Sequence, residues 1–193
     1  MAIAYRFLEV PGASSPVVNA INNAGQIAGH SDDRGFLLEP NGEVEFFAPP
    51  DAGSTLAWGL GDEGQVVGPF YTKADFEPDE VSLGYIYDGT NFRIVDPFPE
   101  FPERSIELTG INNNGEISGF YILPDFAGGG SFLLEEDNLR VRDIDIEGSD
   151  RTFAWDLNDG GKVVGQFRIP DLRNSAFLWE NGNIIEELDF PDR

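Results

Sequence analysis

The amino-acid sequence predicts an all-β fold, a four-bladed β-propeller whose blades are four-stranded antiparallel sheets. Two observations carry this prediction. A ten-residue phrase recurs four times, as AINNAGQIAG (20–29), GLGDEGQVVG (59–68), GINNNGEISG (110–119) and DLNDGGKVVG (156–165). Each copy is followed by an aromatic and apolar run that leads into a further strand. Four-stranded units that repeat every 40–50 residues or so are typical of propeller blades. We therefore expect a single repeat domain over 1–193, with approximate units at 11–48, 49–96, 97–146 and 147–190.

The recurring phrase predicts a hairpin between the first two strands of each blade. In the first copy Ile21 enters the turn and Ile27 leaves it, with Asn22 and Gly25 in between. Asparagine opens a type I turn well, and glycine adopts the left-handed conformation that closes it. Glycine stands at this closing position in all four copies, as Gly25, Gly64, Gly115 and Gly161.

The second half of each unit predicts another hairpin, with a central strand that is apolar on both faces. Asn41-Gly42, Asp88-Gly89 and Asn181-Gly182 are strong two-residue turn signals. A strand that is apolar on both faces belongs in a two-sided core, as expected where neighbouring blades pack face to face. The aromatic residues of these strands are therefore expected to pack between blades. They are Phe36, Tyr85, Phe132 and Phe177.

The segment 4–10 resembles the outer strand of a blade, which leaves one strand more than four blades require. We expect it to close the ring against the last blade. The alternatives are a five-bladed propeller, or an incomplete one that is closed by this strand or by another chain. An unpaired edge strand is also a site of self-association.

The repeats resemble the extracellular HAF-repeat family of bacteria. The matching segments are INNAGQIAG, GINNNGEISG, SAFLW, RGFLL and VPGAS. The resemblance implies a repeat fold and an extracellular or cell-surface location, but no reaction. The family's histidine position is occupied here by Arg34, Leu83, Gly130 and Ser175. The opening MAIAYRFLEV has no long apolar stretch, so a secretion leader is expected to be absent from this chain.

Composition excludes several classes of partner. The 35 acidic residues against 12 Lys and Arg give a net charge of −23, which repels nucleic-acid phosphates and anionic membrane surfaces. The absence of cysteine excludes disulfides and thiolate chemistry. No apolar run approaches the ~20 residues that a membrane span needs.

No motif predicts a catalytic residue. GLGDEG (59–64) matches a dinucleotide-binding pattern but stands at a hairpin, without the helix that such a site requires. The segment 156–161 resembles the start of a calcium loop, but Gly160 and Phe167 stand where oxygen ligands are needed. No cofactor is expected, and calcium bound by other acidic loops stays open. Loop carboxylates also leave a glycosidase or polysaccharide lyase as the alternative function.

The expected binding face carries the loops of variable length, and aromatic residues border it. Variable loops on a rigid scaffold commonly carry recognition, and Trp and Tyr suit sugar faces or peptide side chains. We expect a non-catalytic module that binds a carbohydrate or an extracellular protein. A purely structural assembly repeat is a further alternative. The candidate ligand-binding residues are Trp58, Trp155, Tyr71, Tyr121, His30 and Arg168.

Overall fold

The computed structural model describes residues 7–72, 80–135, 140–170 and 174–188. Four antiparallel sheets follow one another along the chain, and each lies within one of the expected repeat units. Blade 1 contains β1 (Val17–Ile21), β2 (Ile27–Ser31), β3 (Arg34–Leu38) and β4 (Val44–Phe47). Blade 2 contains β5 (Ser54–Thr55), β6 (Gly59–Leu60), β7 (Val66–Tyr71), β8 (Leu83–Tyr87) and β9 (Phe92–Val95).

Blade 3 contains β10 (Ser105–Ile111), β11 (Glu116–Ile122), β12 (Gly129–Glu135) and β13 (Arg140–Ile144), with a short 3-10 helix, η1 (Pro124–Phe126), between β11 and β12. Blade 4 contains β14 (Arg151–Leu157), β15 (Val163–Arg168), β16 (Asn174–Glu180) and β17 (Asn183–Leu188). Within each blade every strand pairs with the next along the chain, except that β5 and β6 both pair with β7. The predicted all-β fold of four-stranded blades is confirmed.

The turn of the repeated phrase has the predicted geometry. In blade 1 the N–H of Gly25 donates to the carbonyl of Asn22 at 3.0 Å, and the N–H of Asn22 donates to the carbonyl of Gln26 at 3.1 Å. Gly25 has φ +81°, a left-handed conformation in which a side chain would be strained. The phrase is therefore repeated because the same hairpin begins every blade.

The innermost strand of every blade is irregular at one position. A register shift interrupts β1 between Val18 and Ala20, β10 between Leu108 and Gly110, and β14 between Ala154 and Asp156. In blade 2 the same interruption separates β5 from β6. A bulged residue leaves the regular alternation of the strand, and its side chain is directed away from the ladder. The four residues at this position are Asn19, Trp58, Thr109 and Trp155.

Three apolar cores fill the spaces between neighbouring blades. The core between blades 2 and 3, for example, joins Val67 and Ile86 to Ile117 and Phe132. The four aromatic residues expected between blades are all fully buried: Phe36, Tyr85, Phe132 and Phe177. Three of them pack against a neighbouring blade. Phe36 of blade 1 instead packs against Val10, since blade 1 is the first blade among the described residues.

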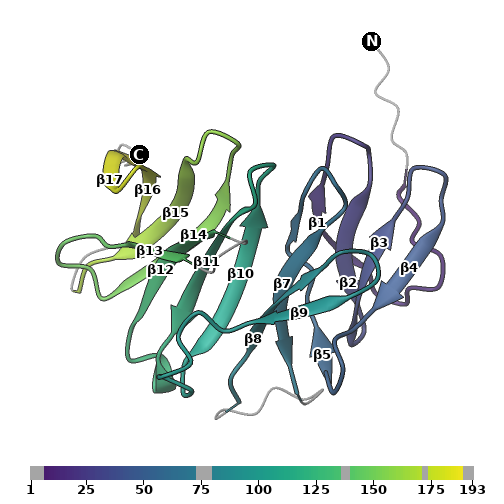
Figure 1. Ribbon diagram of the computed structural model, residues 1–193, viewed down its shortest axis with the longest axis horizontal. Coiled ribbons are helices and arrows are strands. Elements are labelled where there is room, and N and C mark those ends of the chain that lie inside the picture. The colour runs from purple at the N-terminus through teal and green to yellow at the C-terminus, as the bar shows by residue number, and fades with distance from the viewer. Residues whose placement is uncertain (1–6, 73–79, 136–139, 171–173, 189–193) are drawn as a thin grey trace.

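The blades form an open array rather than a closed ring (Figure 1). Blade 1 and blade 4 lie at opposite ends of the molecule. This is the incomplete propeller that the sequence left as an alternative. Of the strand expected at 4–10, residues 4–6 lie outside the described part, and residues 7–10 belong to no strand. Val10 and Ala13 cover part of the outer face of blade 1 instead.

Candidate functional site: a hollow between the inner strands

The four irregular positions of the inner strands meet around one hollow of about 230 Å³. Its lining residues are Asn19, Trp58, Thr109 and Trp155, one from each blade. The bulges bring them together because each removes one side chain from the ladder of its strand and directs it between the blades. Trp155 remains 45% exposed, so the hollow opens to solvent on the side of blade 4.

Aromatic rings form one wall of the hollow. The ring centroids of Trp58 and Trp155 lie 6.4 Å apart, and Phe120 of blade 3 lies 5.5 Å from Trp155. Phe153 stacks against Trp155 at 6.2 Å and contacts Phe120 edge to face at 4.9 Å. Such pairs hold the indole of Trp155 in place even though it is partly exposed.

Asn19 contributes a polar side chain to the lining. Nδ2 of Asn19 donates to the carbonyl of Ala57 at 2.8 Å and lies 3.1 Å from Nδ1 of His30. These contacts orient the Asn19 amide. Within the described residues, no hydrogen bond is made by Oδ1 of Asn19 or by the indole N–H of Trp58 or Trp155. The residues that line the hollow therefore carry one acceptor and two donors that make no hydrogen bond within the described part of the chain.

Thr109 closes the floor of the hollow. It is buried, and its hydroxyl group contacts Oγ of Ser118 at 2.9 Å and the Ser118 carbonyl at 3.1 Å. The Thr109 hydroxyl is thus occupied by its own blade.

The structure places the six sequence-predicted residues in different surroundings. Trp58 and Trp155 line the hollow, and His30 supports it through Asn19. Burial lowers the pKa of His30, so its imidazole is neutral near pH 7. The other three residues lie in separate polar or aromatic contacts.

Tyr121 and Arg168 have structural partners. Tyr121 packs edge to face on Phe98 at 5.2 Å, and the guanidinium of Arg104 lies 4.4 Å above its ring. Arg168 donates from Nε to Asp150 at 2.9 Å and forms an ion pair with it. That guanidinium lowers the pKa of the Asp150 carboxyl. These residues fasten loops to blades rather than facing the hollow.

Tyr71 leads to a buried carboxyl group that the sequence did not single out. Its hydroxyl donates to Oε1 of Glu107 at 2.9 Å, and Oγ of Ser82 donates to the same oxygen at 2.9 Å. Glu107 is only 4% exposed, and burial raises its pKa to about 7. A glutamate inside the apolar run SIELTGI was the available signal, because a charged residue rarely occupies a two-sided strand without a partner.

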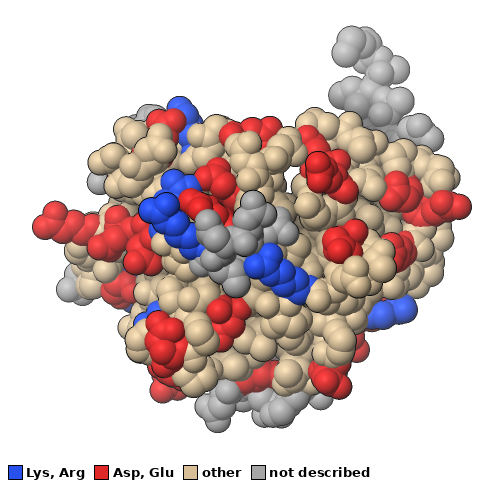
Figure 2. Space-filling model, in the orientation of Figure 1, with Lys and Arg blue, Asp and Glu red and all other residues tan. Residues whose placement is uncertain are grey.

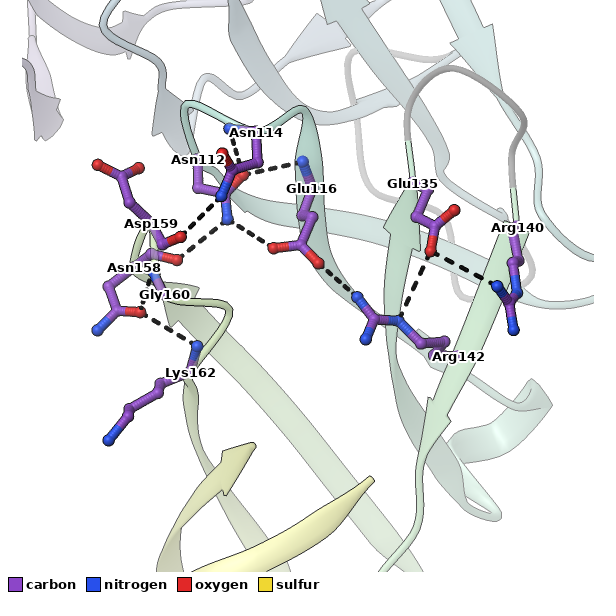
Figure 3. A network of polar contacts seen from close by, with 10 residues as sticks. All are labelled: Asn112, Asn114, Glu116, Glu135, Arg140, Arg142, Asn158, Asp159, Gly160 and Lys162. Carbon is purple, nitrogen blue, oxygen red and sulfur yellow. Dashed lines mark hydrogen bonds and ion pairs between the residues drawn. The ribbon is translucent and has the colours of Figure 1, made fainter. Parts of the chain in front are cut away.

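The repeated turns bind one another around the inner edge of the array. In blade 1, Nδ2 of Asn22 donates to the carbonyl of Gly61 in blade 2 at 3.0 Å. Figure 3 shows the same contact between blades 3 and 4, where Nδ2 of Asn112 donates to the carbonyl of Asn158 at 3.0 Å. Beside it, Arg142 pairs with Glu116 and lies 4.0 Å from Glu135. The phrase thus joins blades as well as turning the chain.

Acidic side chains are spread over the surface shown in Figure 2, with few basic ones among them. In the described part of the chain, no group of three or more His, Asp or Glu is arranged to hold a metal ion. Most of the acidic run at 75–80 lies outside that part, so calcium binding stays a prediction. Among the described residues no helix is both long and apolar enough to cross a membrane.

Comparisons with known proteins show the fold and no family. No family model and no curated protein matches the chain, so the HAF-repeat resemblance stays a prediction. The structure is similar to the β-propeller domain of the Trilobed protease from Pyrococcus furiosus, described as having an open velcro topology. The TM-score is 0.56 at 16% identity, over 92% of this chain and 52% of that one. It is also similar to an acylaminoacyl peptidase from Pyrococcus horikoshii, with a TM-score of 0.56 at 16% identity, over 93% of this chain and 27% of that one. The chain therefore spans about half of the first and about a quarter of the second.

Proposed function

We propose that this chain is a non-catalytic, extracellular binding module that receives a carbohydrate ring or a protein side chain in the hollow between its inner strands. The convergence of two indole rings with Asn19 and Thr109 supports this proposal. Indole rings offer flat apolar area with a polar edge, which matches the alternating C–H and hydroxyl surfaces of a sugar. The extracellular location rests on the resemblance of the repeats.

The size and composition of the hollow favour a single ring as the ligand. Small-molecule pockets commonly measure about 300–1,000 Å³, whereas this hollow measures about 230 Å³. Hydrolysis of a glycosidic bond needs two carboxyl groups that flank it. None of the four lining residues carries a carboxyl group. Binding is therefore better supported than the glycosidase or lyase alternative.

A glycan array tests the proposal, probed with the purified protein in calcium and again in chelator. We expect one class of sugar to bind in both conditions and its affinity to fall more than tenfold in Trp155→Ala. A tenfold loss corresponds to about 1.4 kcal/mol, which is modest for the removal of a stacked aromatic. Asn19→Ala should weaken binding as well, because Oδ1 is the free acceptor of the hollow.

Phe126→Ala is the matched control, because Phe126 is an exposed aromatic of η1 that does not line the hollow. Equal loss in Trp155→Ala and Phe126→Ala would contradict the proposed site. An array that stays blank in both conditions would contradict sugar binding. Binding in calcium alone would move the site to the acidic loops.

A further inference from the structure

The two end faces of the array resemble the faces that pack between neighbouring blades. In blade 4, Val164 pairs with Leu178 and faces away from blade 3. The equivalent pairs in the other blades are Ala28 with Leu37, Val67 with Ile86, and Ser118 with Leu133. Each of those pairs is covered by the following blade. Val164 is 42% exposed, whereas Ala28, Val67 and Ser118 are fully buried.

The outer face of blade 1 shows the opposite half of the same interface. Val18 and Ile21 are 45% and 69% exposed. Their equivalents in blade 3, by pairing register, are Leu108 and Ile111, which are buried in the core with blade 2. Within the described residues, no blade covers the outer face of blade 4 and none covers the outer face of blade 1. Apolar faces of this kind are usually covered by a partner.

The turns show which partner would fit. At the fourth position of the repeated phrase, successive blades carry Asn23, Asp62, Asn113 and Asp159. Asn113 donates from its backbone and its side chain to Asp159 of the following blade, at 2.9 Å each. Its side chain also donates to Asp62 of the preceding blade at 2.9 Å. The Asn113 amide thus donates to an aspartate on either side.

The alternation of Asn and Asp leaves one group without a second neighbour at each end of the array, and these two groups are complementary. Asp159 has an amide neighbour only in blade 3, and Asn23 has an aspartate neighbour only in blade 2. A second copy that places blade 1 after blade 4 would set its Asn23 beside Asp159, as Asn113 stands beside Asp62. Within the described residues Nδ2 of Asn158 donates no hydrogen bond, and the carbonyl of Asn22 would be its acceptor, by analogy with Asn112 and Asn158.

We propose that this chain associates head to tail with a second copy of itself, with the outer face of blade 4 packed on β1 at the outer face of blade 1 of the other copy, beside the part that Val10 and Ala13 cover. Two such contacts, related by a two-fold axis, close a ring of two times four blades. For comparison, this chain covers 52% of a propeller domain of the same fold. The inference is independent of the ligand, although both copies would then line one axial channel.

Sedimentation equilibrium measures the mass directly, in about 0.5 M salt, which screens the repulsion between two chains of net charge −23. We expect twice the chain mass of 21.2 kDa. Val18→Arg and Val164→Arg should each give a monomer, because either change puts a bulky charge in a contact that both interfaces need. Ile94→Arg is the matched control, since Ile94 is 43% exposed on β9 of an internal blade and should leave the dimer intact.

Mixing the two monomeric variants tests the head-to-tail arrangement. Val18→Arg retains a normal blade 4 face and Val164→Arg retains a normal blade 1 face, so an equimolar mixture should regain one interface and form a heterodimer. Thermal unfolding of each variant checks that it is folded. A wild-type monomer at tens of micromolar would overturn the proposal, as would a dimer unchanged by both substitutions or masses well above twice that of the chain.

Discussion

The hydroxyl group of Tyr71 donates a hydrogen bond of 2.9 Å to Oε1 of Glu107, which links the end of β7 in blade 2 to the inner strand of blade 3. Oγ of Ser82 donates to the same oxygen, while Oε2 is buried without a partner among the described residues. Burial of a charged carboxylate in this setting costs free energy, because water no longer solvates the charge. Burial of the protonated carboxyl group costs less. The contact between blades 2 and 3 is therefore sensitive to pH.

Glu107→Gln should remove this sensitivity. Burial raises the pKa of Glu107 from an ordinary 4.5 to about 7. The folded state then holds its proton more tightly than the unfolded state, so the stabilising effect is complete below about pH 4.5 and is lost as the pH rises through about 7. Relative to the wild type, the variant should gain up to about 3 kcal/mol in free energy of unfolding between about pH 5 and about pH 8. Urea unfolding at both pH values measures this gain. If the free energies of unfolding of the two proteins changed in parallel with pH, Glu107 would not be the group responsible.

Asn112→Ala should destabilise the protein by about 2–3 kcal/mol, because it removes several hydrogen bonds of a buried amide. Oδ1 of Asn112 accepts from the N–H groups of Asn114 and Glu116, and Nδ2 reaches the carbonyl of Asn158 in blade 4. Asn41→Ala is the control, since the Asn41 side chain bonds only to the exposed Glu43 of its own turn. It should cost less than about 1 kcal/mol. Chemical unfolding compares the two, and equal losses would mean that the contact between turns contributes nothing.

Tryptophan fluorescence should report occupation of the hollow. The chain has three tryptophans, of which Trp58 and Trp155 line the hollow and Trp179 is buried in the core between blades 3 and 4. A sugar found on the array should change the emission of Trp179→Phe, which keeps both indoles of the hollow. It should leave the emission of a Trp58→Phe, Trp155→Phe double variant unchanged. A change that persists in the double variant would place the ligand elsewhere.

Asp156→Ala should strengthen the proposed association of two copies. Asp156 stands in blade 4 where the other blades have the small residues Ala20, Gly59 and Gly110. Partial burial already raises the pKa of its carboxyl, and a second blade would remove more water from it. The dissociation constant of the dimer should fall several-fold, measured by sedimentation at neutral pH. A weaker dimer in this variant would contradict the packing of blade 4 on blade 1.

The repeated phrase by itself determined the four hairpins and the class of fold. Type I turns closed by Gly25 and its equivalents depend on a few adjacent residues, and apolar residues on both faces of the central strands require a blade on either side. These features can be predicted from the sequence because they depend on residues that are close together in the chain. The same pattern places Trp58 and Trp155 at equivalent positions near the start of the first strand of a blade, bordering the face of variable loops, but it did not predict the hollow that they line.

Only the tertiary structure decided that the blades stop short of a ring, that irregularities in the four inner strands create one hollow, and that Glu107 is buried between Tyr71 and Ser82. The twist between blades is the sum of many packing contacts, so no single segment of the sequence encodes whether blade 4 returns to blade 1. Bulges depend on the pairing register of neighbouring strands, and the pKa of Glu107 depends on side chains that come from two different blades. These properties arise from contacts between residues far apart in the chain, which the order of residues alone does not specify.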